Sequence, residues 1–143
     1  MSSTLNELGT YVHDSISGYR EAVGKADCSN LRSAFSMRQR ERERTLARIN
    51  AELRAQGKDT IDSGSVRGGL HRIWLNVTDA LASGDKAVIE AVEEGEEYLK
   101  DRFEAALRND DLAEGERVTI GFCLEEVARG EFFADQLEDI ASR

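Results

Sequence analysis

An apolar stripe that carries one inward-facing acid constrains the fold of this chain more than any other feature. Apolar side chains recur at three- and four-residue steps between residues 85 and 107, which predicts a helix with one buried face: Val88, Val92, Leu99, Phe103 and Ala106. At about 100° per residue, the neighbouring acids Glu90, Glu94, Glu97 and Asp101 point away from that face. Glu96 points along it, because it follows Val92 by four residues and precedes Leu99 by three. A carboxylate in that position needs a buried partner.

An earlier segment supplies a matching cation. Residues 27–30 offer caps for a second helix that continues to about residue 56 and stops at Gly57. Its apolar stripe consists of Leu31, Phe35, Leu46, Ile49 and Leu53. Arg42 lies at the centre of that stripe and Arg38 at its edge, so we expect Arg42 and Glu96 to form a buried ion pair.

The composition favours an all-helical protein of a single domain's size. The 143 residues include no proline, 40% are hydrophobic and 33% are charged. The net charge of −9 opposes binding to nucleic acid, because that binding depends on basic side chains. The sequence contains no export signal and no apolar run of membrane-spanning length, so we expect a cytoplasmic protein without a membrane partner.

The remaining periodic segments complete the predicted architecture. Further helices are expected over residues 4–26, 65–82 and 111–140. The polar loop over residues 57–65 would be stretched by a full-length crossover, so a plain antiparallel hairpin is the easier connection. This pattern predicts an antiparallel four-helix bundle over residues 1–109, followed by a fifth helix within residues 110–143.

The fifth helix carries a seam of small and apolar residues with coiled-coil spacing: Ile120, Cys123, Val127, Gly130, Ala134, Leu137 and Ala141. Four helices can close a core without it. The fifth helix therefore either packs along the bundle or joins two subunits, and we favour a homodimer or another form of self-association.

Two polar positions on the other helices bear on metal binding. On the first helix, Asp14 is turned away from the apolar stripe, so this helix offers the bundle centre no carboxylate. His71 lies nearly opposite Trp74 on the third helix. A surface or interhelix hydrogen bond is the simpler interpretation of His71, and a role as ligand or proton carrier is the alternative.

Several short motifs occur in order along the chain. They are Asp14 with Gly18-Tyr19-Arg20-Glu21, Arg42 with Leu46, Gly64-Ser65 with Gly68, His71-Arg72 and Trp74, and finally Gly95-Glu96. Together they resemble a bacterial family of ferritin-like four-helix-bundle proteins of unknown function, over residues 5–107. The resemblance implies a ferritin-like bundle and a stress-related role. It assigns no reaction, so Asp14, Tyr19, His71 and Trp74 are motif residues without a known role.

A ferritin-like fold raises the question of a di-iron centre, which takes inward Glu and Glu-x-x-His ligands from four helices. The fourth helix offers Glu93-x-x-Glu96 without a histidine, and an inward Arg42 would repel a cation. We therefore predict no conventional di-iron centre. A single site that uses Glu93, Glu96 and His71 stays open as an alternative.

The sequence as a whole predicts a soluble, non-enzymatic helical-bundle protein without a cofactor, with a structural or stress-associated interaction role. This prediction rests on the lack of any recognisable nucleophile, phosphate-binding loop or zinc-ligand spacing. The alternative is a metal-binding or iron-oxidising ferritin-like protein, which rests on analogy of fold.

Overall fold

The computed structural model is all-helical in the residues that it describes, which are 4–64, 69–80, 83–135 and 137, without the side chains of 70, 71, 78, 85 and 131–135. Five helices are present there: α1 (Thr4–Lys25), α2 (Ser29–Ala55), α3 (Gly69–Ala80), α4 (Asp85–Leu107) and α5 (Glu114–Asp135). The predicted all-α fold class, a bundle of antiparallel helices with an additional C-terminal helix, is confirmed.

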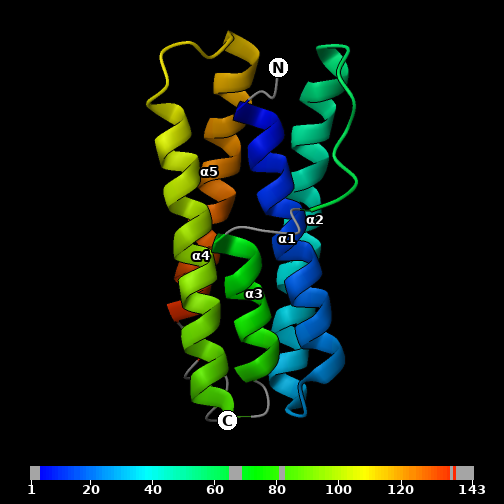
Figure 1. Cartoon of the computed structure of the whole chain (residues 1–143), viewed down its shortest axis with the longest axis vertical. Helices are drawn as coiled ribbons and strands as arrows, with labels where there is room; N and C mark the ends of the chain where they lie inside the picture. Colours follow the sequence, from blue (N-terminus) through cyan, green and yellow to red (C-terminus); the bar gives the residue numbers. More distant parts are fainter. Residues whose placement is uncertain (1–3, 65–68, 81–82, 136, 138–143) are drawn as a thin grey trace.

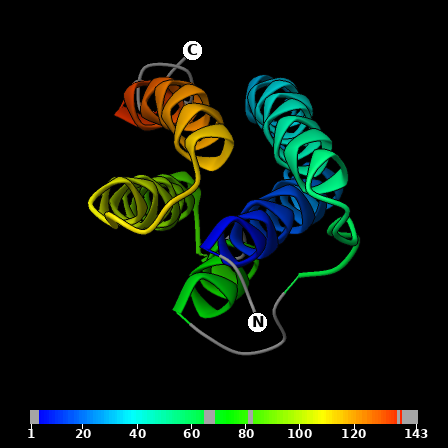
Figure 2. The same ribbon diagram turned by 90° about the horizontal axis from the view of Figure 1, so that it is seen from above.

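Successive helices alternate in direction along the long axis of the molecule (Figure 1). Seen from above, they form a ring in the order α1, α2, α5, α4, α3 (Figure 2), and each helix contacts its two neighbours in the ring. The fifth helix therefore lies between α2 and α4, where it belongs to the wall of the bundle.

The two halves of the bundle along its long axis differ in packing, because α3 is only about half as long as the other helices and lies in one half (Figure 1). In the half without α3, α1 contacts α4 directly, and the rings of Tyr11 and Tyr98 meet edge to face with centroids 6.1 Å apart. In the other half, α3 lies between α1 and α4.

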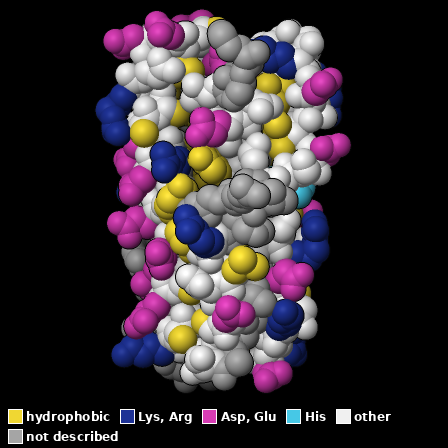
Figure 3. Space-filling view, in the orientation of Figure 1, with side chains coloured by type: hydrophobic (Ala, Val, Ile, Leu, Met, Phe, Trp, Pro, Cys, Tyr) yellow, Lys and Arg dark blue, Asp and Glu magenta, His cyan; other side chains and the backbone are white. Residues whose placement is uncertain are grey.

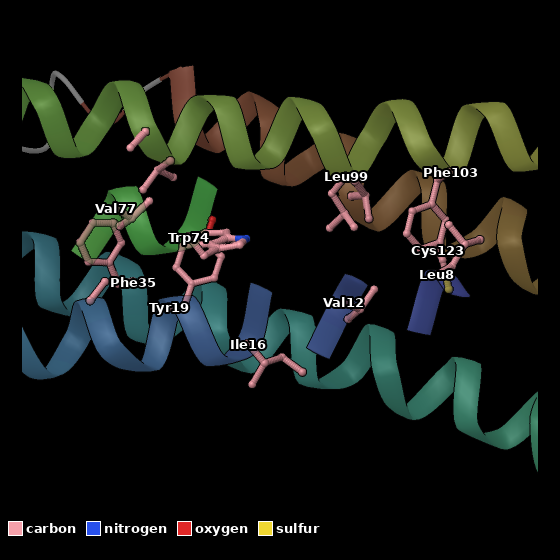
Figure 4. Close-up of a cluster of buried hydrophobic side chains, with 14 of the residues drawn as sticks. Leu8, Val12, Ile16, Tyr19, Phe35, Trp74, Val77, Leu99, Phe103 and Cys123 are labelled. Atoms are coloured by element: carbon pink, nitrogen blue, oxygen red, sulfur yellow. The ribbon is translucent and has the colours of Figure 1, made fainter. Parts of the chain in front are cut away.

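The predicted apolar stripes form the core (Figure 4). Leu99 and Phe103 of α4 have no exposed surface, and the four acids predicted to point outward from α4 are exposed. Figure 3 shows acidic and basic side chains interspersed over one face of the molecule. The bounds of α4 are those that the apolar periodicity predicts.

The connection between α2 and α3 begins at Gly57, whose φ of +72° ends α2 as predicted. Residues 57–64 then run back along the bundle, so that α3 is antiparallel to α2 (Figure 1). Ile61 is fixed on the way: its N–H donates to Asn50 Oδ1 at 2.8 Å, and Asn50 Nδ2 donates to its carbonyl at 3.2 Å. Residues 65–68 and 81–82 of the predicted third helix lie outside the described residues.

The seam of α5 is buried within the chain itself. Ile120, Cys123, Val127 and Leu137 have no exposed surface, and Gly130 is also buried. The fifth helix therefore packs along the bundle, which is one of the two alternatives that its sequence allows. Ala134 and Ala141 of the predicted seam lie outside the described side chains.

Within the described ranges, none of the helices combines the length and the apolar character that crossing a membrane requires.

Candidate functional site

Four polar side chains meet inside the bundle, and we call them the polar cluster: Tyr19, Arg38, Arg42 and Glu96. Tyr19 comes from α1, the two arginines from successive turns of α2, and Glu96 from α4. Tyr19, Arg42 and Glu96 are 0% exposed and Arg38 is 2% exposed. Each occupies a position on the buried stripe of its helix, so the same periodicity that builds the core also places these polar groups.

The polar cluster is held by contacts between helices. The Tyr19 hydroxyl donates a hydrogen bond to Glu96 Oε1. Arg42 Nη2 donates to the main-chain carbonyl of Glu126 on α5 at 3.0 Å. Arg38 Nη1 forms an ion pair with Glu41 Oε2 at 2.6 Å on its own helix. These contacts connect α1 to α4 and α2 to α5.

Gly130 of α5 makes room for the charged ends of the polar cluster. A Cβ atom at this position would lie 2.5 Å from Glu96 Oε2 and 2.8 Å from Arg42 Nη2, and it would also collide with Arg38 Nη2. Because real Cβ atoms do not approach other atoms this closely, any larger residue at this point of the seam would displace the charged ends of these three side chains.

Arg42 and Glu96, the predicted buried ion pair, therefore lie on opposite sides of the same small space. Within the described part of the chain, no hydrogen bond or ion pair joins them directly, and Glu96 Oε2 and Arg42 Nη1 have no hydrogen-bond partner. Their direct partners are the Tyr19 hydroxyl and the Glu126 carbonyl. Sequence periodicity places both charges in the core, but it does not identify these partners because they come from other helices.

Burial raises the pKa of the Tyr19 hydroxyl well above its ordinary value, and the charge of Glu96 raises that pKa further. The positive charges of Arg38 and Arg42 act in the opposite direction. Tyr19 is thus a neutral hydrogen-bond donor at physiological pH. The Tyr19, Arg42 and Glu96 side chains have no exposed surface, so their hydrogen bonds join the helices that surround them.

Trp74 of α3 explains why glycine precedes both Tyr19 and Glu96. A Cβ atom on Gly18 would collide with the indole ring, and a Cβ atom on Gly95 would lie 3.3 Å from it. The Trp74 ring therefore lies between the backbones of α1 and α4, with its centroid 4.5 Å from that of the Tyr19 ring (Figure 4). The motif residues Gly18-Tyr19, Trp74 and Gly95-Glu96 belong to one packed unit.

Asp14 is buried although the sequence places it outside the apolar stripe of α1, and only 5% of its surface is exposed. The connection from α2 to α3 covers the outer side of α1 here, and a Cβ atom on Gly64 would collide with Asp14 Oδ1. The sequence could not show this burial, because it depends on the path of a loop from another part of the chain.

Of the metal-site candidates, the structure describes the side chains of Glu93 and Glu96. In the described ranges, no group of three or more His, Cys, Asp or Glu side chains is placed to hold a metal ion. Glu96 faces a tyrosine and two guanidinium groups, and Glu93 is half-buried one turn earlier. This donor set does not fit di-iron binding. The His71 side chain lies outside the described residues.

Comparison with known proteins identifies one family. The family model described as Domain of unknown function (DUF2383) matches residues 1–109. No curated protein and no solved structure matches the chain. The match ends just after α4, so α5 lies beyond it.

Proposed function

We propose a non-enzymatic role for this chain, which belongs to the family described as Domain of unknown function (DUF2383). In this role the helical bundle joins a second copy of itself through α5. The polar cluster fixes the register of the helices, and the outer face of α5 supplies the contact. A structural or stress-associated interaction role is part of this proposal.

The observation that carries the proposal is the exposure of two apolar side chains on α5. Val118 is 48% exposed and Phe122, one helical turn later, is 52% exposed. The other large hydrophobic side chains with comparable exposure in the described residues, Met37 and Leu75, lie singly on α2 and α3. Neighbouring apolar residues on one helix face are typical of a contact surface, whereas single exposed ones are ordinary.

The surroundings of Phe122 also resemble an interface. The Arg48 guanidinium lies 5.3 Å from the centroid of the Phe122 ring, and Arg48 Nε is 3.4 Å from Glu126 Oε1. An aromatic residue with a polar rim is the usual form of a binding hot spot. Because the Glu126 carbonyl also accepts a hydrogen bond from Arg42, the outer face of α5 is anchored to the polar cluster.

Light scattering coupled to size-exclusion chromatography tests this proposal. We expect the intact 15.9 kDa chain to elute with about twice its monomer mass at high micromolar concentration. Phe122→Glu should shift the mass to that of a monomer. Leu75→Glu is the matched control, because Leu75 is 51% exposed but lies on α3, and it should leave the dimer intact. A monomeric intact chain, or equal effects of both substitutions, would overturn the proposal.

The alternative of a metal-binding or iron-oxidising protein rests on the ferritin-like resemblance. Purification without chelators, followed by anaerobic Fe(II) titration and exposure to air, distinguishes it from the proposal. Stoichiometric iron with an oxo-ferric absorption band would replace the non-enzymatic role.

A further inference from the structure

We propose that the outer groove between α1 and α2 is a binding site for a small organic monoanion, specifically a carboxylate with a short apolar body. This inference is independent of self-association, because the site lies on α1 and α2 and involves no residue of α5.

The groove contains a cavity of about 320 Å³, which lies within the range of small-ligand pockets. Its apolar lining includes Ile16, Leu46 and Ala47. Ile16 is buried, whereas Leu46 is only half-buried although the sequence places it in the core stripe of α2. Leu46 is partly exposed because it faces this open groove.

The connection from α2 to α3 shows that this groove accommodates an apolar group. The Ile61 side chain packs against Gly9, and the main chain of Ile61 is bonded on both sides by Asn50. Ile16 lies about two turns further along α1, where the cavity is open. The amide oxygen and one N–H of Asn50 are already hydrogen-bonded to the main chain of Ile61. The Asn50 side chain therefore serves mainly as a wall of the cavity.

The charges around the cavity favour a single negative charge. Arg20 of α1 and Arg54 of α2 line it, and in the described part of the chain neither guanidinium has a hydrogen bond or an ion pair. Glu43 is the one acid in the lining, so two arginines and one glutamate give a formal charge of +1. A monoanion neutralises this charge, whereas a dianion would leave an excess.

His13 supplies a further polar group. It lines the same cavity, while its buried Nδ1 atom, which has no hydrogen-bond partner among the described residues, lies beside Gly64 of the connection from α2 to α3. The cavity therefore combines an apolar surface, two guanidinium groups on different helices and an imidazole. Guanidinium groups bind carboxylates through strong, charge-assisted hydrogen bonds.

Titration of the full ¹⁵N-labelled chain with hexanoate, followed by NMR, tests the inference. We expect saturable shifts of the amides of His13, Ile16, Arg20, Leu46 and Ala47. The double substitution Arg20→Ala with Arg54→Ala should weaken hexanoate binding about tenfold or more.

Two controls make the result specific. Arg40 and Arg44 are exposed arginines of α2 that do not line the cavity, so Arg40→Ala with Arg44→Ala changes the net charge equally and should leave binding unchanged. Hexanol, which has the apolar body without the charge, should bind at least about tenfold more weakly than hexanoate. Unsaturable shifts, equal losses in the two double variants, or equal binding of hexanol would each overturn the inference.

Discussion

The Arg42 guanidinium is fully buried, yet its direct hydrogen bond goes to a main-chain carbonyl of α5 and not to a carboxylate. Glu96, the nearby buried acid, is bonded by the Tyr19 hydroxyl. A buried charge is tolerated only when surrounding polar groups replace the water that it loses. The charges of Arg42 and Glu96 thus each depend on a helix other than their own.

Loss of Arg42 should therefore be severe. We expect Arg42→Ala to lower the free energy of unfolding by about 3–5 kcal/mol, because it empties a fully buried position, removes the hydrogen bond to the Glu126 carbonyl and takes away one of the two cations beside Glu96. Arg44→Ala, at an exposed position two residues later, should change it by less than about 0.5 kcal/mol. Urea unfolding of both variants provides the measurement, and equal midpoints would contradict the assigned role of Arg42.

The sequence predicts the burial of Arg42 and Glu96 because each lies within an apolar stripe of fixed period. It does not predict the partners of these charges or the burial of Asp14. Those features depend on residues brought together from distant segments, such as Gly130 against Glu96 and Gly64 against Asp14. Periodicity within a single helix carries no information about such contacts.

The close approach of α1, α3 and α4 depends on glycine at two points. Gly18 of α1 and Gly95 of α4 both present bare backbone to the Trp74 ring. The indole can therefore lie between two helices and still contact the Tyr19 ring. This packing gives a physical reason for the glycines that precede Tyr19 and Glu96 in the motifs.

Alanine substitutions at Gly18 and Gly24 should distinguish the effect of packing on stability from the effect of helix propensity. We expect Gly18→Ala to destabilise the chain by about 1–3 kcal/mol, because the new methyl group would overlap the Trp74 ring. Gly24→Ala is the control on the same helix: nothing lies within 4 Å of its added methyl group, so this substitution near the end of α1 should be neutral or stabilise by up to about 0.5 kcal/mol. Thermal unfolding would contradict this interpretation if both variants shifted in the same direction.

The helices differ in how well the sequence predicts them. The bounds of α4 follow from its stripe and its flanking turn, and the end of α2 follows from Gly57. The path of residues 57–64 could not be predicted, since it is fixed by the bonds between Asn50 and Ile61. Those bonds join a loop to the outer side of a helix, where no apolar pattern marks the contact.

In the molecule as a whole, the fifth helix completes the ring. A core of four helices is sufficient on sequence grounds, but the structure places α5 between α2 and α4 and buries its seam there. The length of the apolar seam on α5 indicates that this helix packs against another surface. It does not indicate whether that surface belongs to the same chain or to a second subunit. Only the three-dimensional arrangement shows that the partner surface is within the same chain.

The global stability should fall at alkaline pH. Burial raises the pKa of Cys123 from 9.0 to about 12 and raises that of Tyr19 well above 10.0. Both groups are neutral in the folded chain, so above about pH 9 the unfolded chain releases protons that the folded chain retains. Their contribution to stability is therefore complete below pH 9 and is lost as the pH rises through the folded pKa values.

Melting temperatures measured from about pH 7 to pH 11 check this expectation. The intact chain should show a plateau to about pH 9 and a decline above it. Tyr19→Phe should start from a lower plateau, because it removes the hydrogen bond to Glu96, and should decline less steeply. A melting temperature that rises or stays level through this range would contradict the assigned pKa directions.

Trp74 also determines what optical spectroscopy can report on this protein. It is the chain's only tryptophan, and it lies in the half of the bundle that contains α3, against the Tyr19 ring. Its fluorescence therefore reads the local environment of that half, whereas circular dichroism reads all the helices together. If the half that contains Tyr11 and Tyr98 were to open first, the emission of Trp74 would stay native while the ellipticity fell.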